Sequence, residues 1–178
     1  MPLRVWECAC PPGMLSVYDE NKFGRGGVMD NQLVVFTLGE QRYALRLAAV
    51  DRVVRVVEIN PLPQAPEIVA GVVNVQGRIV PIINVCRRFH LPEREIALTD
   101  QLIIAHTARR PVGLVVDAVI DVIESLEQGI ASAQSILPDL EYVEGVVKLQ
   151  DGLVLIHDLD KFLSLEEETS LTQAMETS

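Results

Sequence analysis

The sequence holds little of what nucleic-acid-binding and membrane-spanning proteins require. Its 15 Lys and Arg face 25 Asp and Glu, so the net charge is −10. This charge argues against a nucleic-acid partner, because phosphate binding needs a concentrated basic surface. No apolar run approaches the roughly 20 residues of a membrane-spanning helix, and Glu7, Pro11 and Pro12 make the start of the chain a poor signal peptide. We therefore expect a cytoplasmic protein without direct membrane insertion.

Patterns that carry catalytic chemistry are also missing. There is no GxSxG, HExxH or Walker loop, and GRGG at 24–27 lies outside any strand-turn-helix context. Asp117 follows a strand and is better explained as a turn residue than as a catalytic partner of Asp121. None of the histidines has a second histidine at helical or strand spacing; they are His90, His106 and His157. The sequence predicts no catalytic residues and no enzyme.

The three cysteines do not predict a metal site. Cys8 and Cys10 form a Cys-x-Cys without a second pair nearby, whereas a zinc site normally has four ligands or three plus an open position. Cys86 lies among apolar residues, which is typical of a small core side chain. We expect reduced cysteines and neither a metal nor a cofactor.

What the chain does hold is aliphatic sequence. It is 49% hydrophobic and only 4% aromatic, with many valines and isoleucines, which favours a strand-rich folded body. Its 178 residues suffice for one ordinary domain or two very small ones packed together. Residues 1–30 mix turn formers with charge and lack periodicity, so we expect a poorly ordered N-terminal extension. Met29 is an alternative start that the intact mass of the native protein would settle.

Short strands follow one another from residue 33. LVVFTL, GEQR and YALRL predict a β-hairpin over 33–47. Five valines within 50–57 favour a strand entered through one tight turn. The prolines of INPLPQAP make a rigid connection, and residues 69–85 predict a second hairpin with its turn at Gln76 and Gly77.

The second half of the chain repeats this order, which indicates an internal duplication. Placing Val50 over Val119 gives an offset of 69 residues (119 − 50). Placing Gly71 over Gly145 gives an offset of 74 (145 − 71). The five-residue difference falls in the linker 126–142, where an insertion is cheapest.

Each copy, about 33–92 and about 99–163, holds about five short strands with edges too exposed to stand alone. We expect each copy to close into a small barrel and the two barrels to pack around a shared core. Asn84 and Asp158 are expected to cap a short helical turn in each copy. Residues 166–178 form an acidic tail, expected to be solvated or to be a fraying helix capped by Ser164.

Charge is distributed unevenly along the chain. Residues 31–92 carry 7 basic and 4 acidic residues, a net of +3, whereas residues 93–163 carry 5 and 13, a net of −8. A basic half beside an acidic half suits contacts with other proteins, head-to-tail ones included. Drift among solvated faces explains the same counts equally well.

Five quoted segments, in this order, resemble the CheW family of bacterial chemotaxis coupling proteins: VFTLGEQRYAL, PLPQAP, GVVNVQGRIVPIINV, VGLVVDAVIDV and EGVVKLQDGLVLIHDLDKFL. The resemblance runs from about residue 33 to 163 and implies a CheW-like domain at 31–165, with an all-β fold, short helices and two SH3-like five-stranded β-barrels. It also implies a cytoplasmic, non-catalytic scaffold recruited to membrane-associated receptor arrays. The implied partners are the regulatory domain of a chemotaxis histidine kinase, the cytoplasmic tip of chemoreceptors, and other CheW-like proteins.

The resemblance implies partner contacts at seven positions, two of which depart from the family pattern. Arg52 stands where the family usually has glutamate, and Gln76 where it usually has an arginine tied to partner binding. Asn84 also replaces a usual aspartate. Those that match contact positions are Val50, Gly71, Gly113, Val119 and Val122. We expect a divergent coupling protein whose kinase carries complementary changes.

Two other interpretations stay open at this point. One is a CheW-like scaffold of a non-flagellar, pilus-type chemosensory pathway. The other is a barrel that binds a small ligand or an oligonucleotide, which would need exposed aromatic rings for stacking. The aromatic residues within the repeats occupy positions that look buried: Phe36, Tyr43, Phe89, Tyr142 and Phe162.

Overall fold

The computed structural model describes residues 31–124, 130–132, 142–150 and 152–177. The expected N-terminal extension, with Cys8 and Cys10, lies outside these residues. The strands and helices follow in this order: β1 (Gln32–Leu38), β2 (Gln41–Arg46), η1 (Leu47–Ala49), β3 (Val50–Arg55), β4 (Val69–Val75), β5 (Arg78–Ile83), α1 (Val85–Arg88), β6 (Gln101–His106), β7 (Pro111–Val116), β8 (Ala118–Glu124), β9 (Ile130–Ser132), β10 (Val143–Leu149), β11 (Gly152–His157), η3 (Leu159–Lys161) and α3 (Leu165–Thr177).

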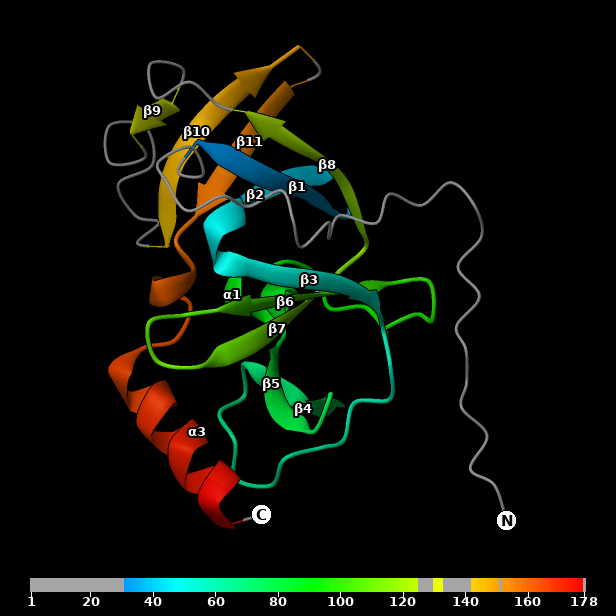
Figure 1. Cartoon of the computed structure of the whole chain (residues 1–178), viewed down its shortest axis with the longest axis vertical. Coiled ribbons are helices and arrows are strands. Elements are labelled where there is room, and N and C mark those ends of the chain that lie inside the picture. The colour runs from blue at the N-terminus through cyan, green and yellow to red at the C-terminus, as the bar shows by residue number, and fades with distance from the viewer. Residues whose placement is uncertain (1–30, 125–129, 133–141, 151, 178) are drawn as a thin grey trace.

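The strands form two mixed sheets, one above the other in Figure 1. The upper sheet has the order β8-β1-β2-β11-β10-β9, and the lower sheet has the order β3-β6-β7-β5-β4. Most pairs are antiparallel, but β2 pairs with β11 and β5 with β7 in parallel. The fold is mostly β with short helices, and its two sheets are consistent with two SH3-like barrels.

The two copies exchange their first hairpins. The hairpin β1–β2 of the first copy completes the sheet of β8, β10 and β11, while β6–β7 of the second copy completes the sheet of β3, β4 and β5. The expectation that each copy closes on itself is therefore wrong. The two hairpins share the same alternation of apolar residues, so either hairpin can pair with the remaining strands of either sheet. The sequence pattern therefore does not distinguish pairing within a copy from exchange between copies.

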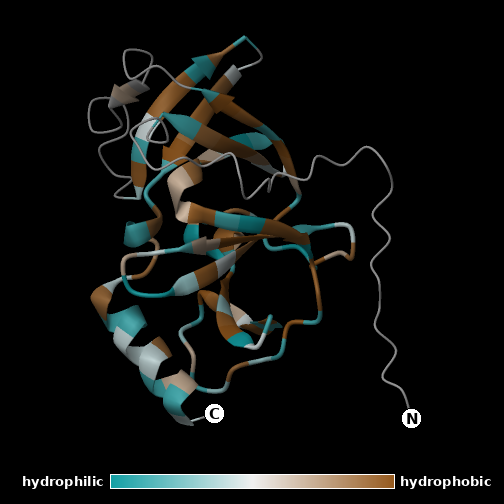
Figure 2. Ribbon diagram, in the orientation of Figure 1, coloured by the Kyte–Doolittle hydropathy of each residue, from teal (hydrophilic) through white to brown (hydrophobic). Residues whose placement is uncertain are grey.

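Apolar side chains of the described residues form three clusters, because the strands of both hairpins are buried on both faces. Figure 2 shows that hydrophobic residues are frequent along the strands of both sheets. In β2, Tyr43 and Leu45 point into one cluster and Ala44 into another, as the alternation predicted. The largest cluster joins both sheets and includes Phe36, Ile103, Leu114, Phe162 and Leu171. This cluster is the shared core that the sequence predicted. The other two belong to one sheet each.

The helical segments begin where the sequence predicted their caps. The Asn84 side chain accepts a hydrogen bond from the Arg87 N–H at 3.2 Å, and Asp158 accepts one from the Asp160 N–H at 3.1 Å. Ser164 and Glu167 exchange hydrogen bonds as a capping box at the start of α3. Asn84 retains the capping acceptor that the usual aspartate would supply, so this departure from the family pattern has a structural explanation.

Helix α3 is docked on the protein rather than solvated along its length. Leu171 is fully buried in the shared core. The Arg110 guanidinium, from the β6–β7 turn, lies 3.1 Å from the Glu168 carboxylate, and Arg88 of α1 pairs with Glu167. One arginine from each copy thus holds the helix in place. The expectation of a solvated tail or a fraying helix did not foresee these contacts.

Candidate functional site

Besides Val50 at the start of β3, four of the seven expected contact residues belong to the lower sheet. Register places Gly71 of β4 opposite Ile82 of β5, and Ile82 opposite Gly113 of β7. Gly113 in turn lies opposite Ile104 of β6, and Ile104 opposite Arg52 of β3. One transverse row therefore crosses all five strands of the sheet. Gln76, the fourth residue, belongs to the turn that joins β4 to β5.

The two glycines of this row are buried, and each lies where a side chain would meet a neighbouring segment. A Cβ atom on Gly71 would lie 2.3 Å from the backbone oxygen of Asn60, and φ at Gly71 is +152°. A Cβ atom on Gly113 would lie 2.4 Å from Cδ1 of Ile82. Their effect on binding would be indirect, through the positions of the strands.

Replacing Gly71 with alanine is expected to lower the free energy of unfolding by about 2–4 kcal/mol, since it combines an unfavourable φ with overpacking. Gly152→Ala is the matched control, because φ is +135° at Gly152 but no atom lies within 4 Å of the added Cβ. Urea denaturation of both variants separates the two effects. Equal losses would show that the contact with Asn60 costs nothing.

Arg52 and Gln76 meet at a small cavity of about 280 Å³. Gln76 has φ = +51° and Gly77 has φ = +82°, the pattern of a tight hairpin turn, and the Gly77 N–H donates to Asn74 Oδ1 at 2.8 Å. Since β3 and β4 lie at opposite ends of the strand order, the lower sheet must curl to bring Arg52 to this turn. The structure thus unites the two positions at which the sequence departs from the family pattern.

Sequence reasoning missed two further polar residues of this cavity and the histidine that pairs with one of them. Asp51 and Arg78 line it, and His106 Nδ1 lies 3.0 Å from Asp51 Oδ1. Arg78 follows Gln76 by two residues on a hairpin, so a cross-turn argument would have found it. The pairing of Asp51 with His106 depends on strand register and has no local signal.

The remaining predicted contacts lie on the two outer strands β3 and β8, which occupy equivalent places in the two copies. Val50 and Val119 are half-buried and pack against the shared core, so Val50 is less exposed than predicted. Val122 is 36% exposed and its neighbour Ile120 is 51% exposed; on β3 the most exposed apolar side chain is Val53, at 37%. Each outer strand therefore presents apolar surface at the end of its sheet's strand order.

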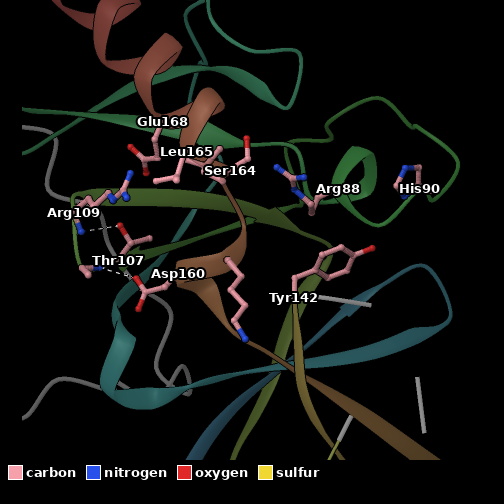
Figure 3. A pocket seen from close by; sticks show the side chains of 12 residues that line it. Arg88, His90, Thr107, Arg109, Tyr142, Asp160, Ser164, Leu165 and Glu168 are labelled. Carbon is pink, nitrogen blue, oxygen red and sulfur yellow. Dashed lines mark hydrogen bonds between the residues drawn. The ribbon is translucent and has the colours of Figure 1, made fainter. Parts of the chain in front are cut away.

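A larger cavity of about 870 Å³ opens between α3, η3 and the β6–β7 turn (Figure 3). Its polar groups are largely engaged with one another. The Ala108 N–H donates to Asp160 Oδ1 at 2.7 Å, and the Arg109 N–H donates to Thr107 Oγ1 at 3.2 Å. These contacts fasten the turn to η3. Sequence reasoning missed this cavity because it exists only once α3 has docked.

The residues considered and rejected as catalytic have structural surroundings. Asp117 Oδ2 accepts the Gly39 N–H at 2.6 Å, which steadies the β1–β2 turn, and Asp117 also pairs with Arg94. Burial raises the pKa of the Cys86 thiol, which disfavours the reactive thiolate. Among the described residues no group of three or more His, Cys, Asp or Glu is placed to hold a metal ion.

His157 is buried in the shared core, and four aromatic rings surround it. It is 2% exposed, and its ring centroid lies 4.2 Å from that of Phe89 and 5.3 Å from that of Tyr43; Tyr142 and Phe162 complete the group. Within the described residues neither imidazole nitrogen makes a hydrogen bond of regular geometry, although the Tyr142 backbone lies near enough to favour the protonated ring. Phe36, Tyr43 and Phe162 are at most 4% exposed, so these three rings offer no stacking surface to an oligonucleotide, whereas Phe89 and Tyr142 are half-buried.

Comparisons with known proteins agree on one family. Residues 32–167 match the CheW-like domain family. The chain is 31% identical over 142 residues to "Chemotaxis protein CheW" of Treponema pallidum, covering 76% of this chain and 84% of that protein. It is 29% identical to that of Rhizobium meliloti, covering 76% and 89%. A solved structure, the scaffolding protein TtCheW from Thermoanaerobacter tengcongensis, superimposes with a TM-score of 0.71 at 31% identity, covering 82% of this chain and 95% of that one. No helix in the described part of the chain is long and apolar enough to cross a membrane.

Proposed function

The chain belongs to the CheW-like family, and on this premise we propose that it is an adaptor that couples chemoreceptors to a chemotaxis histidine kinase in membrane-associated receptor arrays. It is a scaffold of chemotaxis signalling and not an enzyme. The proposal concerns its partners: the regulatory domain of the kinase, the cytoplasmic tip of the receptors, and other proteins of the same fold.

The observation that carries the proposal is the contrast between the two outer strands. Both expose apolar side chains, but β3 carries Arg52 and Arg55 beside Asp51, whereas β8 carries Asp121 and Glu124. Exposed strand edges favour pairing with another protein, and opposite charges favour different partners. A duplication has thus produced two similar edges of different specificity, which is what an adaptor needs.

Arg52 and Gln76 support a kinase with complementary changes. Arg52 stands where the family usually has glutamate, so a partner meets a positive charge there instead of a negative one. Gln76 stands where the family usually has arginine, so the turn beside it lacks that positive charge. Sign reversal excludes partners built for the opposite charge. We propose that the kinase of the same organism is matched to this chain.

Calorimetric titration with the regulatory domain of that kinase tests the proposal. We expect micromolar or tighter binding, weakened at least about tenfold by Val53→Asp, because burying an unpaired carboxylate in an apolar contact is costly. Val53 is preferred to Val50, whose packing against the core would confound binding with folding. Leu153→Asp is the control, since Leu153 is 56% exposed on the β10–β11 hairpin of the other sheet (Figure 1).

Absence of binding, with both proteins folded, would refute the kinase partnership. Retargeting is tested separately, by titration with the regulatory domain of an unrelated chemotaxis kinase. We expect weaker binding there; equal affinity for the two domains would refute a role of Arg52 and Gln76 in partner choice.

A further inference from the structure

We infer that the small cavity between β3 and the β4–β5 turn binds a carboxylate side chain from a protein partner. Arg52 and Arg78 would hold this carboxylate. The inference rests on the proposed function and specifies the chemistry of one contact within it. The cavity has a volume of about 280 Å³, enough for the end of an Asp or Glu side chain.

The two arginines reach this cavity from different strands. Arg52 comes from the middle of β3 and Arg78 from the first residue of β5. Each guanidinium is a planar fork of N–H donors that matches the geometry of a carboxylate, and the cavity lining holds two of them. The Gln76 side chain adds an uncharged N–H donor at the same cavity.

Neither arginine is paired with another described residue. In the described part of the chain, Arg52 and Arg78 make no ion pair and no side-chain hydrogen bond. Several other arginines form ion pairs with glutamates; these pairs include Arg46–Glu144, Arg87–Glu93, Arg88–Glu167 and Arg110–Glu168. Two unpaired cations on one cavity repel each other, so an anion between them is favourable.

The rest of the lining strengthens the preference for a carboxylate. Val75, Val80, Ile104 and Pro111 supply an apolar wall, next to which an ion pair is screened less than in open water. Asp51 is the one acid on the lining, and its Oδ1 lies 3.0 Å from His106 Nδ1. The cavity lining therefore carries the two positive charges of Arg52 and Arg78 and one negative charge, that of Asp51, which already contacts His106.

The first test is calorimetric titration of the full chain with the regulatory domain of the kinase from the same organism. Arg52→Glu and Arg78→Glu are each expected to weaken binding about 30-fold or more, because each removes one half of the carboxylate site and adds repulsion. Arg109→Glu is the matched control: it makes the same change of charge at the larger cavity, and we expect less than a threefold effect. Equal losses in all three variants would indicate long-range electrostatics and overturn the inference.

A second test does not depend on the kinase. Glutarate is titrated into the isotopically labelled chain at constant ionic strength, and the Nε–Hε resonances of the arginines are followed by NMR. Saturating shifts of Arg52 and Arg78, abolished in either Glu variant and absent at Arg109, support the carboxylate site even if the kinase domain fails to bind. Uniform or non-saturating shifts in all three arginines overturn it, whatever the outcome for the proposed function.

Discussion

Truncating Leu171 to alanine should lower the free energy of unfolding by about 2–5 kcal/mol, the usual cost of deleting a fully buried leucine side chain. Leu171 is 0% exposed and joins helix α3 to the cluster shared by both sheets. Leu165→Ala is the control on the same helix, because Leu165 is 70% exposed; there we expect less than about 0.5 kcal/mol. Chemical denaturation at constant pH measures both.

A loss of less than about 1 kcal/mol for Leu171→Ala would contradict the docked position of α3. The surrounding contacts predict the larger value. Arg110 meets Glu168, which is only 8% exposed, and also donates to Thr172; Arg88 pairs with Glu167. Burial alone would raise the pKa of Glu167, but the hydrogen bonds from Ser164 and the Arg88 guanidinium outweigh it and hold the pKa below its usual value, as expected for a carboxylate that anchors the helix.

The second large effect is a loss of stability in acid caused by His157. Burial lowers the pKa of His157 to about 4, from an ordinary 6.5, and the Tyr142 backbone opposes this shift only in part. Between these two pH values His157 is protonated in the unfolded chain and neutral in the folded chain. Neutral His157 therefore makes its full contribution to the free energy of unfolding above pH 6.5. This contribution decreases as the pH falls towards 4, by about 3 kcal/mol in all.

The effect of His157 is isolated by comparing the protein with His157→Phe, which keeps a ring among Phe89, Tyr43, Tyr142 and Phe162 but does not titrate. Unfolding free energies are measured from pH 7.5 to pH 4. The advantage of the variant over the wild type should grow by about 3 kcal/mol over that range. Parallel curves would show that the imidazole becomes protonated without cost in the folded state.

Much of the local structure follows from the sequence. The hairpin alternation at Tyr43 to Leu45, the tight turn before β3 and the caps at Asn84 and Asp158 all depend on neighbouring residues, and the structure confirms them. The exchange of hairpins between the copies is different. It depends on which of two equivalent partners a strand meets, and a duplicated sequence gives both partners the same apolar pattern.

The candidate site was predicted in part. Arg52 and Gln76 were singled out separately, and the curl of the lower sheet brings them to one cavity. Arg78 was passed over, although its place two residues after Gln76 on the same hairpin is a local signal that could have identified it. Gly71 and Gly113 were expected to contact partners, yet both are buried where a Cβ atom would collide with Asn60 or Ile82. Such close approaches come from strands distant in sequence.

The adaptor role is tested most directly by sedimentation of the kinase with receptor-containing membranes from the same organism, with and without this protein. We expect the kinase to pellet with the membranes only when the protein is present, and Val53→Asp to reduce the pelleted fraction while Leu153→Asp does not. Kinase that pellets equally well without the protein, or that stays in the supernatant although both proteins are folded and receptors are in excess, would contradict the coupling of receptors to kinase through this chain.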